Sequence, residues 1–119
     1  MTINKIFPET LNIKERYALT KSPKIQRMSD IVGSVISVKA YAVYTDEDKE
    51  GKSRVILSIM DQDGDVYATN SVSFAREFAD IVSMCEQCDG LDLAEALSSI
   101  EIMSGTSKSG RTYLTCAMV

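Results

Sequence analysis

Apolar and polar side chains alternate over several short stretches of the chain, and a period of two predicts β-strands. Residues 35–44 are rich in Val, Ile and Tyr and contain neither Gly nor Pro. Residues 54–60 alternate more strictly, and residues 65–69 follow Asp63-Gly64, a pair typical of tight hairpins. We therefore predict three consecutive strands joined as a meander.

The period changes from two to that of an α-helix after this meander. Apolar side chains recur at helical spacing over residues 74–85, behind Ser71, a residue type that caps helix N-termini. Two further strands are predicted at residues 100–103 and 111–118, joined by a loop rich in Ser and Gly. The predicted order is strand, strand, strand, helix, strand, strand.

A short helical arm is predicted over residues 1–31. Asn12 followed by Glu15 matches a capping box, and Ser22-Pro23 offers a second helix start. Apolar side chains on these two helical turns should hold the arm against the remainder of the chain.

The predicted order of elements is that of the OB-fold, a five-stranded, partly open barrel. A chain of 119 residues with 45% hydrophobic content can build one core without disulfides. We therefore predict a mainly β fold, a single OB-like domain over residues 1–119. It should contain a five-stranded barrel with the helix between the third and fourth strands, and the helical arm packed on it.

The sequence shows no sign of export or of membrane insertion. No apolar run approaches the ~20 residues that cross a bilayer, and the first residues lack the apolar stretch of a signal peptide. We expect a cytoplasmic protein with reduced thiols and no membrane partner.

Three cysteines and the absence of histidine limit the chemistry that the chain can perform. Cys85 and Cys88 form a CxxC pair, but structural zinc takes four Cys or His ligands, and Cys116 is the only other thiol. A thioredoxin-type nucleophile lies at a helix start, whereas this pair is expected at a helix end. We predict neither a metal site nor a redox site.

Two further motifs come close to known sites without matching them. Residues 105–112 differ from a P-loop at one position, where Arg111 replaces the required Lys, and a strand rather than a helix should follow. Residues 61–65 are rich in Asp but lack the spacing of an EF-hand calcium loop. No catalytic residues and no cofactor are predicted, so we expect a protein that is not an enzyme.

The net charge of −4 is unevenly distributed along the chain. Residues 61–100 hold nine Asp and Glu against one Lys or Arg, whereas residues 1–30 hold six Lys and Arg against three Asp and Glu. Binding depends on the potential at one surface rather than on the total charge. An acidic total therefore does not exclude a nucleic-acid partner.

Strand alternation places basic and tyrosine side chains on an outward face, by the same count that buries Val38, Val66 and Leu114. Binding of a single strand needs cations for phosphates and aromatic rings on which bases stack. The candidate residues are Lys39, Tyr41, Arg54, Tyr67, Arg111 and Tyr113 on the strands and Lys108 in the last hairpin. The competing interpretation is that tyrosines favour strands and that Lys and Arg simply solubilise the surface.

Residues 20–30, 38–44, 68–74 and 104–111 carry patterns that bear on this choice. They resemble small single-stranded DNA-binding proteins of phages and prophages of Gram-positive bacteria. The resemblance implies an OB-like domain that binds single-stranded DNA during phage DNA replication or recombination, in the cytoplasm of the bacterial host cell.

A second class of function fits the acidic segment. An adaptor or inhibitor could use residues 61–95 to contact a basic partner protein. The two hypotheses are compatible, because an acidic surface could recruit replication proteins while the strands hold DNA. The sequence leaves the oligomeric state open.

Overall fold

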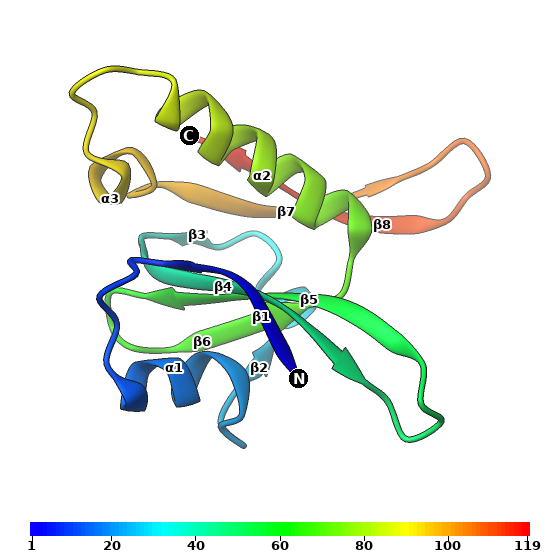
Figure 1. Cartoon of the computed structure of the whole chain (residues 1–119). Coiled ribbons are helices and arrows are strands. Elements are labelled where there is room, and N and C mark those ends of the chain that lie inside the picture. The colour runs from blue at the N-terminus through cyan, green and yellow to red at the C-terminus, as the bar shows by residue number, and fades with distance from the viewer. The chain divides into compact units, whose positions relative to one another are not determined.

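The computed structural model describes residues 1–119, which form two compact units. One unit comprises Met1–Arg27 and Lys39–Asn70, and the other comprises Met28–Val38 and Ser71–Val119. The first contains a five-stranded mixed sheet and the second a three-stranded antiparallel sheet (Figure 1). Neither sheet closes into a barrel, so the predicted OB-like barrel is wrong, and the fold belongs to the α/β class.

The sheet of the first unit has the strand order β1-β4-β5-β6-β2. β4 (Val38–Glu47), β5 (Ser53–Asp61) and β6 (Val66–Thr69) lie side by side, which confirms the predicted meander. β1 (Thr2–Phe7) extends one edge antiparallel to β4, and β2 (Gln26–Arg27) extends the other edge parallel to β6.

The core of the first unit lies between this sheet and α1 (Ile13–Thr20), as Figure 1 shows. Small and medium apolar side chains of the central strands meet apolar side chains of the N-terminal segment. The buried members are Leu11, Leu19, Ala40, Ala42, Tyr44, Met60 and Val66. The alternation count therefore predicted the burial of Ala40, Ala42 and Val66 correctly.

α1 begins at the predicted capping box. The Asn12 side chain accepts a hydrogen bond from the Glu15 backbone N–H at 2.8 Å, and the Glu15 carboxylate accepts one from the Asn12 N–H at 3.4 Å. Two backbone donors that the helix leaves unpaired are thereby satisfied.

Asn12→Ala is expected to lower the free energy of unfolding by about 1 kcal/mol, because it removes the acceptor at the helix start. Asn12→Asp keeps an acceptor and should retain the parent stability. Urea unfolding followed by circular dichroism measures both variants. Equal losses in the two would contradict a capping role for the side chain.

The predicted helical arm is right only for α1. β1 was missed because four of its six residues are exposed and the strand shows no alternation between buried and exposed positions. Ser22-Pro23 does not start a helix: the Ser22 hydroxyl accepts from the Lys24 N–H at 3.1 Å within a turn. β2 and a short 3₁₀ helix, η1 (Met28–Ile31), follow this turn.

The second unit pairs β3 (Val35–Ile36), β7 (Ile100–Thr106) and β8 (Thr112–Met118), in that order. The predicted strand 35–44 is therefore divided between two sheets, since β3 pairs with β7 and β4 pairs with β1. The two strands are separated at Ser37, and each belongs to a different sheet.

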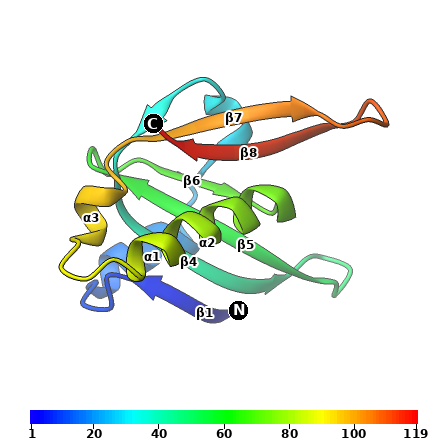
Figure 2. The same cartoon turned by 90° about the horizontal axis from the view of Figure 1, so that it is seen from above.

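The predicted amphipathic helix is confirmed as α2 (Val72–Glu86), which packs against β8 (Figure 2). It begins at Ser71, whose hydroxyl accepts from the Phe74 N–H at 3.2 Å. A second short helix, α3 (Leu93–Ala96), begins at Asp92. None of the helices has the length and apolar character needed to span a membrane.

Candidate nucleic-acid interface

The seven residues predicted to bind DNA are divided between the two units. Four belong to the first unit and three to the second. They are Lys39, Tyr41, Arg54 and Tyr67 in the first, and Lys108, Arg111 and Tyr113 in the second.

Tyr41 is a core residue rather than a surface platform, with 2% of its surface exposed. It lies opposite Phe7 of β1, and the two rings stack with centroids 5.6 Å apart. The Lys5 ammonium lies 6.0 Å from the centroid of the Tyr41 ring. The predicted outward position of Tyr41 is wrong, because Phe7 of β1, a strand that the sequence analysis does not predict, packs against its ring.

Tyr67 is also buried, with 9% of its surface exposed, so its predicted outward position is wrong too. Its cross-strand partner is Ile59, and opposite residues of an antiparallel pair share a face. Tyr67 therefore shares a face with Ile59, which is fully buried. Strand alternation in the sequence instead predicts that Ile59 points inward and Tyr67 outward, on opposite faces of the sheet.

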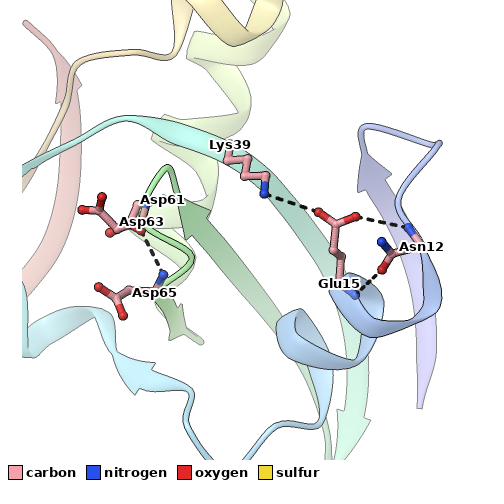
Figure 3. Close-up of polar contacts among 6 residues, drawn as sticks. All are labelled: Asn12, Glu15, Lys39, Asp61, Asp63 and Asp65. Carbon is pink, nitrogen blue, oxygen red and sulfur yellow. Dashed lines mark hydrogen bonds and ion pairs between the residues drawn. The ribbon is translucent and has the colours of Figure 1, made fainter.

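The surroundings of the Tyr67 hydroxyl are acidic. Burial raises the pKa of this hydroxyl above its usual value, and the charges of Asp61, Asp65 and Asp63 raise it further. The three carboxylates sit in the β5–β6 turn, where the Asp61 side chain accepts from the backbone N–H groups of Asp63 and Asp65, both at 3.0 Å (Figure 3). Such a turn repels phosphate.

Lys39 is exposed, as predicted, but its charge is partly neutralised. Its ammonium lies 3.6 Å from a carboxylate oxygen of Glu15, the residue that completes the capping box of α1 (Figure 3). A phosphate would have to compete with this ion pair.

Arg54 is exposed near the start of β5. It is two residues from Ile56, which packs on the α1 side of the sheet, so Arg54 shares that face. Burial, and then the charge of Asp46, raise the pKa of the Tyr44 hydroxyl, and the charge of Arg54 offsets part of this rise.

The three remaining residues, Lys108, Arg111 and Tyr113, are all exposed in the β7–β8 hairpin. From Ile102 to Val119 the chain contains no Asp or Glu. The turn is ordered by hydrogen bonds from the Ser107 N–H to the Arg111 carbonyl at 2.8 Å and from the Gly110 N–H to the Ser107 carbonyl at 2.9 Å. The hairpin extends well beyond α2 (Figures 1 and 2).

The Tyr113 ring has a defined position on this hairpin. It lies opposite Gly105, and a Cβ atom at Gly105 would come within 2.5 Å of the Cζ and hydroxyl atoms of the Tyr113 ring. The ring therefore occupies the space of a side chain at 105, while 43% of Tyr113 stays exposed. Sequence reasoning missed Gly105, although glycine within a strand indicates close approach of another group.

The three thiols are free, and they differ in their exposure to solvent. Cys85 and Cys116 are buried and Cys88 is exposed. Burial, with a smaller contribution from Glu77, raises the pKa of Cys116 to about 12. Since the thiolate is the nucleophile, Cys116 stays protonated and unreactive near neutral pH.

Comparison of the chain with protein-family models, curated proteins and solved structures finds no match. The resemblance to phage single-stranded DNA-binding proteins therefore stays a prediction.

Proposed function

We propose that this protein binds single-stranded DNA without catalysis, through the β7–β8 hairpin. The observation that carries the proposal is the exposure of Lys108, Arg111 and Tyr113 on one hairpin, within residues 102–119, which include no Asp or Glu. The two cations hold phosphates, and the tyrosine ring receives a base. The resemblance of residues 104–111 to phage proteins of this function supports the same assignment.

The hairpin geometry suits binding that is independent of sequence. Arg111 directly precedes β8 and Tyr113 is the second residue of that strand, so the cation and the ring are close neighbours along the hairpin. Every nucleotide offers a phosphate and the face of a base, and neither contact reads the edge of a base. Within this proposal the protein acts on phage or prophage DNA during replication or recombination, in the host cytoplasm, and needs no cofactor.

Lys108→Ala and Arg111→Ala should each weaken binding to all oligonucleotide sequences. Each variant should also reduce the slope of log K against log salt concentration by about 0.7, because one phosphate contact and its released counterion are lost. Fluorescence anisotropy with labelled oligo-dT and a mixed-sequence oligomer, at several salt concentrations, measures both effects.

Lys39→Ala is the matched control, since Lys39 already pairs with Glu15 in the first unit. It should leave the slope unchanged. If both hairpin variants keep the parent slope, the hairpin is not the DNA site and the proposed function loses its support.

A further inference from the structure

An apolar groove of about 380 Å³ lies on the second unit. α2, the loop after it, α3 and the end of β8 form its walls, so it lies at the end of the unit away from the hairpin tip (Figures 1 and 2). Its lining includes Ile81, Met84, Cys88, Leu91 and Met118.

The large side chains of this groove are unusually accessible to solvent. Met84 is 70% exposed, Met118 48% and Leu91 45%. Single exposed apolar residues are common on protein surfaces, but a group of them around one groove marks an interaction site. Methionine side chains are flexible and adapt to partners of different shape, which suits a docking surface.

Carboxylates adjoin this lining along the chain. Asp80 precedes Ile81, Asp89 follows Cys88, Asp92 follows Leu91 and Glu95 precedes Ala96. No Lys or Arg occurs between Glu77 and Glu95. All four of these carboxylate residues are exposed, so exposed negative charges border the apolar lining along the chain.

We propose that this groove docks a cationic amphipathic helix of a partner protein. Apolar side chains on one face of that helix enter the groove, and its Lys and Arg side chains meet the flanking carboxylates. The proposal goes beyond DNA binding and does not depend on it, because it uses none of the hairpin residues.

The composition of the groove argues against other occupants. A small-molecule site places a few polar groups among its apolar walls to orient the ligand, whereas this lining consists of aliphatic, methionine and cysteine side chains. A nucleic acid would bring its phosphates against the carboxylates. A cationic, partly apolar peptide matches both the apolar lining and the carboxylates that border it.

The test uses the full chain and a fluorescein-labelled peptide of Leu and Lys, about 18 residues or five helical turns long, with all Leu on one helical face. A peptide of the same composition with Leu distributed around the helix is its control. We expect the amphipathic peptide to bind more tightly than the scrambled one. Fluorescence anisotropy measures both.

Met84→Asp should weaken binding of the amphipathic peptide at least about tenfold, because an apolar anchor of the groove is lost. The added negative charge alone would attract this cationic peptide, so electrostatics cannot produce the loss. Val72→Asp is the matched control: Val72 is equally exposed, at 69%, but lies in the first turn of α2 and does not line the groove. It should not weaken binding.

Asp89→Asn combined with Glu95→Gln should weaken binding and reduce its salt dependence, since two of the flanking charges are removed. Equal binding of the scrambled peptide, or equal effects of Met84→Asp and Val72→Asp, would overturn the proposal. So would a concentration-dependent dimer, seen by sedimentation, that Met84→Asp dissociates, because the occupant would then be a second copy of this chain.

Discussion

Replacing Phe78 by alanine is expected to lower the free energy of unfolding by about 3–5 kcal/mol, the largest effect on stability that we predict for this chain. Phe78 lies in the middle of α2 with 2% of its surface exposed. Its ring stacks with that of Phe74, with centroids 6.5 Å apart and the ring planes at 10°. Truncation would remove these contacts and leave a cavity that the neighbouring side chains fill only in part.

Glu77→Ala is the matched control, because Glu77 is the preceding residue of the same helix and is exposed. Its replacement should change the stability by no more than about 0.5 kcal/mol. Urea unfolding with a common slope for all variants gives the comparison directly. A loss for Phe78→Ala as small as that for Glu77→Ala would contradict the placement of Phe78 in the core.

The features predicted correctly from the sequence are those that depend on near neighbours. The capping box of Asn12 and Glu15 and the cap at Ser71 each involve residues three apart. The apolar spacing of α2 is likewise a local pattern. Short-range hydrogen bonds and helical periodicity involve residues close together in the sequence. Both α1 and α2 could therefore be predicted from the sequence alone.

The barrel could not be predicted reliably. Alternation of apolar and polar residues identifies a strand, but it does not show with which other strand that strand pairs. Residues 35–44 contain an unbroken set of strand-forming side chains, yet Val35–Ile36 pairs with β7 and the following strand pairs with β1. β1 comes from the first residues of the chain, more than thirty positions away from its partner. Pairings at such distance are set by packing of the whole unit.

The same limit explains the errors at the candidate site. Assigning alternate strand residues to opposite faces assumes that one face of a sheet is buried and the other is exposed. In β5, however, four consecutive residues are all buried: Leu57, Ser58, Ile59 and Met60. Ser58, which the count placed outward, is fully buried and its hydroxyl has no hydrogen-bond partner. At Tyr113 the alternation correctly predicted an exposed side chain, because β8 does carry exposed side chains.

Tyr113→Ala is expected to lower the affinity for oligo-dT by ~1–3 kcal/mol, or roughly 5- to 150-fold, the largest effect on binding that we predict. Tyr113→Phe keeps the aromatic face and should lower it little. Tyr17→Ala controls for the general loss of an exposed tyrosine, since Tyr17 is 54% exposed on α1 of the first unit. It should bind as the parent does.

Gly105→Ala tests the position of the ring while leaving the ring itself unchanged. The added methyl group would overlap the end of the Tyr113 side chain, so the ring must move away from its position over residue 105. We expect weaker DNA binding than in the parent and little change in the thermal unfolding midpoint, since the end of a flexible side chain moves easily. Quenching of tyrosine fluorescence by oligo-dT, measured beside thermal melts, follows both properties. Parent-like affinity in Tyr113→Ala would contradict the stacking model, whereas a loss in Tyr113→Phe as large as in Tyr113→Ala would replace it with a hydrogen bond from the hydroxyl.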